Sequence, residues 1–226
     1  MPVAIAEKSL EVFQDLKLLG PVEQRALLRR ALLDSVMTPW RHAEGDEKIL
    51  LKTLGQESGI LVFHREAADG MAAARLSLWS RPEGYEVVNI VPLAVGQLDH
   101  GEYNAILEDF ASRIAVPAAR KTAFSVRTTS ARQTLEDWVS PDSALALRHF
   151  SHAANKTTGS AHPMDRKRWL RFLLLAHADA KQMDPARLAR WLTEIEGWDG
   201  DTVHGLIAEY EFALELLNEH ALRPNG

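Results

Sequence analysis

The sequence predicts an α+β fold, and three patterns lead to that prediction. Short runs of apolar, β-branched and aromatic residues occupy the middle of the chain, as in antiparallel strands. Apolar residues recur every three or four positions before and after that region, as in amphipathic helices. Turn-forming residues separate the runs. We therefore expect N-terminal helices, a small antiparallel sheet of order β-β-β-α-β with a covering helix, and a C-terminal four-helix bundle.

The N-terminal part predicts two helices and leaves a third one open. The first helix is expected over about 7–18. The second is better marked, because Pro21 stands at its first position and Glu23 favours the positive end of the helix dipole. Pro39 ends this helix, since the residue before a proline avoids the helical conformation. Residues 46–54 are ambiguous and fit a short third helix.

The middle of the chain predicts the sheet. Turn residues that include Gly70 and Gly84 link the first three runs, so these strands should pair as antiparallel neighbours. A helical stripe follows, with Asp99 as its cap. The expected strands are 60–63, 75–79, 85–91 and 124–127, and the covering helix includes Tyr103, Ile106, Leu107 and Phe110 and ends at Pro117.

Four amphipathic helices are expected after residue 140. Ser140, His162 and Asp184 each precede a proline, which is favoured at the first position of a helix. Short links between the helices favour a bundle in which they fold back on one another. The change of pattern near Ser140 predicts two domains, 1–139 and 140–226, that pack together.

The composition excludes several classes of protein. Of 226 residues, 46% are hydrophobic and 25% are charged, which is sufficient for a buried core. The absence of cysteine excludes disulfides and thiolate metal sites. No apolar run approaches the roughly 20 residues of a membrane helix, and the start has no signal-peptide pattern. We expect a cytoplasmic protein without membrane contact, and the net charge of −5 argues against a general nucleic-acid binder.

The polar stretch 149–169 is the strongest candidate for a binding site. Between Arg148 and Arg171 there are six Lys or Arg against one acid, so the local charge is +5. Hydroxyl groups, an amide and a lysine before a helix N-terminus suit a phosphate group, although the P-loop order is missing. The alternative is a solvated connection whose Thr and Ser cap the neighbouring helices. The expected ligand-binding residues are Asn155, Lys156, Thr157, Thr158, Ser160, His162, Arg166 and Arg168.

The last predicted helix is acidic. Eight Asp or Glu and no Lys or Arg occur from Glu194 to Glu219. The outer face of this helix could attract a basic partner. Two alternatives are a solubilising face, or an acidic segment that lies near the basic stretch inside the molecule. The expected partner-binding residues are Glu209, Glu211, Glu215 and Glu219.

No catalytic residue, metal site or cofactor is expected. His149 and His152 are three residues apart and could share a zinc ion, with His162 or Asp165 as the third ligand, but the His-Glu-x-x-His arrangement is missing. The acids near Asp99 and Glu102 are better explained by capping of a helix N-terminus.

Two classes of function therefore remain. The first is a non-catalytic bacterial interaction protein, such as an adaptor or an antitoxin-like or immunity-like partner, that uses its segregated charges. The second is an enzyme or sensor that binds a phosphate-containing ligand, a nucleotide or RNA, at 155–168. We expect the first. A pocket into which Lys156, Arg166 and Arg168 all point would favour the second.

Overall fold

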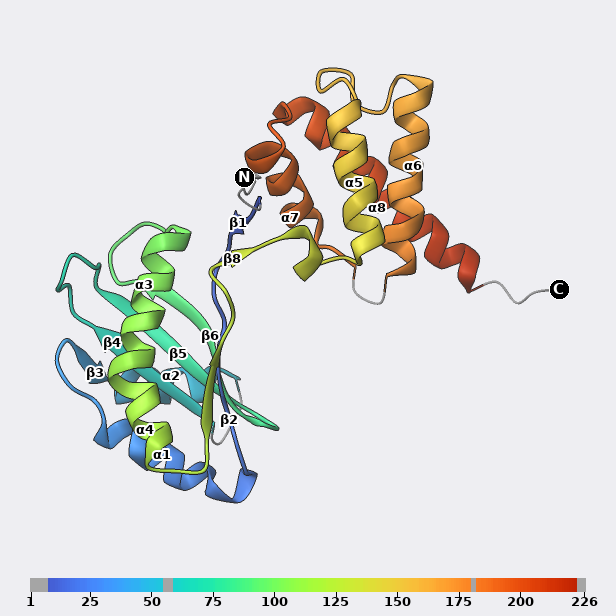
Figure 1. Ribbon diagram of the computed structural model, residues 1–226. Helices are drawn as coiled ribbons and strands as arrows, with labels where there is room; N and C mark the ends of the chain where they lie inside the picture. Colours follow the sequence, from blue (N-terminus) through green and yellow to red (C-terminus); the bar gives the residue numbers. More distant parts are fainter. Residues whose placement is uncertain (1–7, 55–58, 180–181, 223–226) are drawn as a thin grey trace, which may run out of the picture. The chain divides into compact units, whose positions relative to one another are not determined.

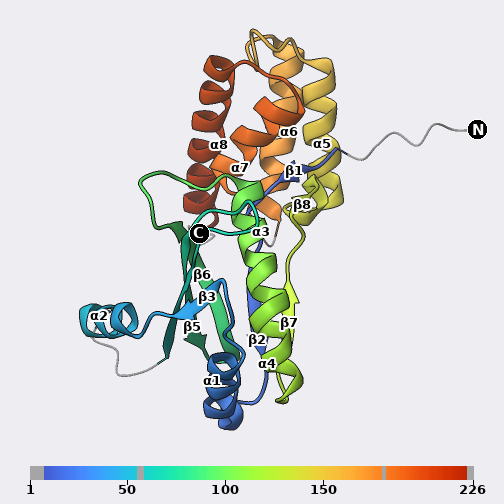
Figure 2. The same ribbon diagram turned by 90° about the vertical axis from the view of Figure 1, so that its left-hand side faces the viewer.

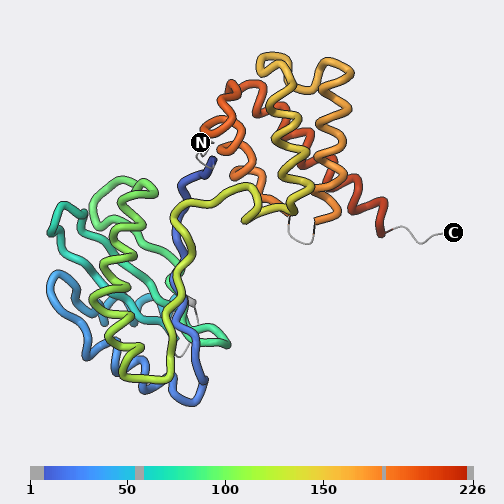
Figure 3. The backbone as a smooth tube through the Cα atoms, viewed as in Figure 1, coloured from blue at the N-terminus to red at the C-terminus, as the bar shows by residue number. Residues whose placement is uncertain are grey.

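The computed structural model describes residues 8–54, 59–179 and 182–222. These residues form two compact units, which we call the sheet unit and the helical unit. The sheet unit is 12–131, and the helical unit combines the described parts of 1–11 and 132–226. The chain therefore passes twice between the units, which the tube in Figure 3 makes easy to follow. The predicted α+β class is confirmed, and the predicted domain boundary at residue 139 stays a prediction.

A six-stranded antiparallel sheet forms the centre of the sheet unit, with strand order β3-β4-β5-β6-β2-β7 (Figure 1). The expected strands cover only part of this sheet, because β2 and β3 also belong to it. Strands β4, β5 and β6 pair consecutively, while β7 pairs with β2. The strands are β2 (Leu16–Leu19), β3 (Trp40–His42), β4 (Ile60–Arg65), β5 (Ala74–Arg81), β6 (Gly84–Pro92) and β7 (Ser125–Thr128).

The predicted helix over about 7–18 is wrong, because the described part of that segment contains strands. Leu16 and Leu18 are fully buried while Lys17 is exposed, which is the alternation of a strand. Pairing with distant strands decides the outcome, since a run this short fits either period. Gly84 lets β2 approach β6, because a Cβ at this residue would lie 1.8 Å from the carbonyl oxygen of Leu18.

Helices cover the two faces of the sheet unequally. One face buries most of the core under α1, α3 and α4, and α2 covers a small cluster on the other face (Figure 2). The predicted helix end at Pro117 is wrong, because a π-helical turn, η2, leads directly into α4, which contains this proline. The helices are α1 (Arg25–Asp34), α2 (Glu44–Leu54), α3 (His100–Phe110), η2 (Ala111–Ala115) and α4 (Val116–Arg120).

The helical unit contains helices in each of the four segments where they were expected. The caps Ser140 and Asp184 are confirmed, since each side chain accepts a backbone N–H of the first turn. His162, which was expected only to precede the proline of a helix start, caps α6 in the same way. The bundle arrangement stays a prediction. The helices are α5 (Pro141–Ala153), α6 (Pro163–Ala178), α7 (Pro185–Arg190), its π-helical continuation η4 (Trp191–Ile195) and α8 (Gly200–Ala221), and a short strand pair joins β1 (Leu10–Glu11) to β8 (Arg132–Gln133).

Aromatic rings form the core of the helical unit. Phe150 and Trp169 pack at a centroid distance of 4.9 Å, and Phe172 stacks on Tyr210 at 6.1 Å. Helix α6 thus packs its inner face against both α5 and α8, and Figure 2 shows the three helices side by side. Among the helices of the described ranges, none is long and apolar enough to cross a membrane.

Candidate functional site

The polar loop between α5 and α6 forms one wall of an open groove of about 540 Å³. The first half of α8 forms the opposite wall. Four of the eight expected ligand-binding residues line the groove. These four are Thr157, Thr158, Ser160 and Arg166, and α8 contributes Asp201, Thr202, Gly205, Leu206 and Glu209.

Two residues of the loop fix its own shape. The side-chain oxygen of Asn155 accepts the backbone N–H of Thr157 at 3.0 Å and the hydroxyl of Thr157 at 2.8 Å, which forms an Asx turn. Gly159 has a φ of 57°, in the left-handed region that favours glycine. A Cβ there would lie 3.0 Å from the methyl group of Thr202, so the glycine also allows the loop to approach α8.

The expected cations are mostly used elsewhere. The Lys156 ammonium donates to the backbone carbonyl of Glu196, which follows the last turn of η4. A lysine at this place interacts favourably with the negative end of the helix dipole. Arg168 pairs with Asp165 at 2.6 Å, and the ring of His162 caps α6 by accepting the N–H of Met164. Of the described residues that line the groove, Arg166 is the one cation.

Acidic side chains occupy the groove as well. Both carboxylate oxygens of Glu209 accept the hydroxyl of Ser160, at 3.1 and 3.0 Å. Arg166 lies 3.9 Å from the same carboxylate, and Asp201 lines the groove too. An anion entering here would meet two carboxylates against one arginine, so the geometry is poorly suited to phosphate. At Glu209 the acidic and basic segments do contact one another inside the molecule.

The outer face of α8 differs from the groove. Three further acids, Glu211, Glu215 and Glu219, are exposed, and within the described ranges they form no ion pair. Phe212 and Leu216 lie beside this acidic row and are 65% and 55% exposed. Sequence reasoning missed both, although their positions off the buried stripe of the helix are a readable signal.

The outer face of α6 carries a second apolar surface. Leu170 and Leu174, one helical turn apart, are 45% and 58% exposed. They line a shallow groove of about 720 Å³ with Pro163 and Leu175, and the charged residues of the lining are Arg166, Lys167 and Arg171. Sequence reasoning located the positive charge of this helix but not its exposed leucines.

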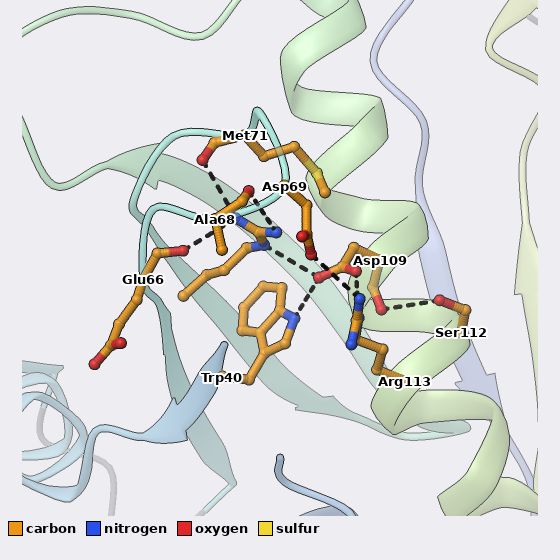
Figure 4. A network of polar contacts seen from close by, with 9 residues as sticks. Trp40, Glu66, Ala68, Asp69, Met71, Asp109, Ser112 and Arg113 are labelled. Atoms are coloured by element: carbon orange, nitrogen blue, oxygen red, sulfur yellow. Dashed lines mark hydrogen bonds and ion pairs between the residues drawn. The ribbon is translucent and has the colours of Figure 1, made fainter. Parts of the chain in front are cut away.

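The sheet unit uses its charges internally. Arg65 is fully buried, and its guanidinium donates to Asp109 at 3.1 Å and to the carbonyls of Glu66 and Ala68. Asp109 also accepts the Trp40 indole N–H at 2.7 Å (Figure 4). Burial alone would raise the pKa of the Asp109 carboxyl, but hydrogen bonds from Arg113, Trp40 and Arg65 lower it below its usual value. This network holds the loop after β4 in place.

A polar pocket of about 790 Å³ lies beside α2 in the same unit. The buried Glu47 carboxylate accepts from Arg29 at 2.5 Å and from His42 at 2.7 Å. Burial raises the pKa of the Tyr85 hydroxyl. Arg25 donates to the backbone carbonyl of Arg81. The charges of this pocket are therefore engaged within the protein, as expected for a structural network.

Two further sources of functional information are groups of metal-binding side chains and similarity to known proteins, and neither points to a function. Within the described ranges, no three His, Asp or Glu side chains gather in a way that could hold a metal ion. No protein-family model, curated protein or solved structure matches the chain.

Proposed function

We propose that the helical unit is a protein-interaction module and that the outer face of α8 is its binding surface. The exposure of Phe212 and Leu216 beside an acidic row supports this proposal most directly. Burying a large apolar side chain is worth about 1.5–3 kcal/mol, so a partner that covers both gains binding free energy. The acids select a partner that is basic as well as apolar.

The proposal assigns no catalytic step to the protein. From the sequence we also expect a more specific role in the cytoplasm, as an adaptor or as an antitoxin-like or immunity-like partner. This role is part of the proposal. A phosphate-binding role has less support, because Lys156 and Arg168 are engaged elsewhere and Glu209 occupies the groove.

A synthetic amphipathic helical peptide of Leu and Lys tests the proposal. We expect the full chain to bind a labelled peptide in fluorescence anisotropy, with an affinity that falls as salt is added. Phe212→Ser and Glu215→Lys should each weaken binding by about tenfold, which corresponds to ~1.4 kcal/mol.

A matched control is Leu145→Ser, because Leu145 on α5 is exposed to the same extent as Phe212, 65%. Its binding should equal that of the wild type. The proposal fails if Phe212→Ser and Glu215→Lys bind the peptide as well as this control does.

A further inference from the structure

We propose that the partner of the α8 face is the α6 face of a second copy of this chain, bound twice in a two-fold symmetric dimer. This inference rests on the proposed function, because it takes the outer face of α8 as a binding surface. It adds the identity of the partner and the second surface of the contact.

The apolar parts of the two faces match in spacing. Leu170 and Leu174 on α6 are four residues apart, as are Phe212 and Leu216 on α8. Four residues span about 6 Å along a helix, so two side chains on one helix can contact two on the other. All four are about half exposed or more.

The charges of the two faces are opposite. Lys167 and Arg171 flank the leucines of α6. A row of acids spaced four residues apart flanks the apolar pair of α8. In the described part of the chain, neither Lys167 nor Arg171 forms an ion pair. Exposed ion pairs add little affinity, but like charges brought together exclude a wrong pairing. The acids of the row are Glu211, Glu215 and Glu219.

The two faces belong to helices that already contact each other through different residues. The stacking of Phe172 on Tyr210 joins the inner sides of α6 and α8. The apolar residues of the two outer faces stay exposed within one copy, so they do not cover one another there. They can pack between two copies, since each copy offers both surfaces.

The outer faces of α6 and α8 begin next to one another, because an ion pair joins the two helices there. Arg166 lies 3.9 Å from Glu209. On α6, Leu170 and Leu174 follow Arg166 by four and eight residues. On α8, the apolar pair follows Glu209 by three and seven residues. These spacings place the charged residue and the two apolar residues of each helix on one side of that helix. A basic stripe beside an acidic stripe is self-complementary under a two-fold axis, because α6 of each copy can meet α8 of the other.

The test is the oligomeric state of the full chain by analytical ultracentrifugation, up to about 100 μM, where a Kd of ~10 μM gives mostly dimer. We expect a dimer. Arg171→Glu and Glu215→Lys should each raise its dissociation constant by at least about tenfold. The double variant Arg171→Glu/Glu215→Lys should dimerise like the wild type, which a folding defect could not produce.

Two control variants change residues outside α6 and α8. Leu145→Ser removes an apolar side chain that is as exposed as Phe212, and Glu108→Lys reverses an exposed acid on α3. Both should leave the dimer unchanged. A chain that is monomeric over the whole concentration range overturns the dimer, and so does a dimer that none of the α6 and α8 variants weakens.

The outcomes also separate the two proposals. A monomeric chain that binds the Leu/Lys peptide through Phe212 and Glu215 keeps the interaction module and rejects self-association. A dimer restored by the double charge reversal supports both, and the peptide should then compete with dimer formation.

Discussion

The two units of this protein use charge in different ways. The sheet unit places ionised groups inside, where each one binds several partners, as Arg65 and Asp109 do. The helical unit has an aromatic core and leaves cations of α6 and acids of α8 on its surface, next to exposed apolar side chains. Buried charge networks favour one internal arrangement, whereas exposed charges beside apolar residues favour recognition.

The largest expected effect comes from breaking the buried network. Asp109→Ala removes a carboxylate that is 8% exposed and leaves Arg65 buried without its counter-charge. We expect a loss of about 3–5 kcal/mol in the free energy of unfolding, measured by urea denaturation. Glu215→Gln on α8 should cost at most about 1 kcal/mol. Similar losses for the two variants would remove the distinction between the units.

A second comparison uses two adjacent leucines of α6. Leu173 is 3% exposed, whereas Leu174 belongs to the outer face. Leu173→Ala should lower the free energy of unfolding by about 2–5 kcal/mol, because it removes buried apolar atoms and leaves a cavity. Leu174→Ala should change the free energy of unfolding by no more than about 0.5 kcal/mol in dilute solution, where the protein is monomeric. A large loss for Leu174→Ala in urea denaturation would mean that the molecule itself covers this face.

The smallest expected effect is a loss of stability at alkaline pH, and both units contribute to it through one buried tyrosine each. Burial raises the pKa of Tyr103 in the sheet unit and of Tyr210 in the helical unit to about 12. Because the unfolded value is about 10, the stabilisation is complete below pH 10 and declines as the pH rises towards 12. The full loss for the buried Tyr210 is about 2–3 kcal/mol.

Urea midpoints between pH 8 and 11 check this expectation. Tyr210→Phe should flatten the alkaline decline, although it also removes the hydrogen bond to the Met183 carbonyl at every pH. If the decline of Tyr210→Phe equals that of the wild type, the shift of the Tyr210 pKa is not its cause.

Much of the fold could be predicted because local signals carried it. The caps Ser140 and Asp184 mark helix starts directly, and the strands in the middle of the chain contain β-branched and aromatic residues. Strands β2 and β3 were missed, because their few residues become strands through pairing with distant segments. The register Leu18 with Tyr85 joins residues far apart in the sequence.

The sequence located the candidate site but did not predict the contacts that its residues make. The loop does line a groove, yet nothing local indicates that Lys156 reaches the carbonyl of Glu196, forty residues away. The same holds for Ser160 and Glu209, which are 49 residues apart. Phe212 is different, because its place off the buried stripe was readable from helical periodicity alone.

The way the chain passes between the units has a topological consequence. Glu11 and Arg132 are opposite each other in the β1–β8 pair, and the backbone N–H of Val12 donates to the carbonyl of Ala131 at 2.9 Å. Residues 12–131 thus start and finish at neighbouring points, like a domain inserted into a host. A tight hairpin turn could replace this whole segment and join residue 11 to residue 132. The helical unit would then be one continuous segment of chain, without the inserted sheet unit.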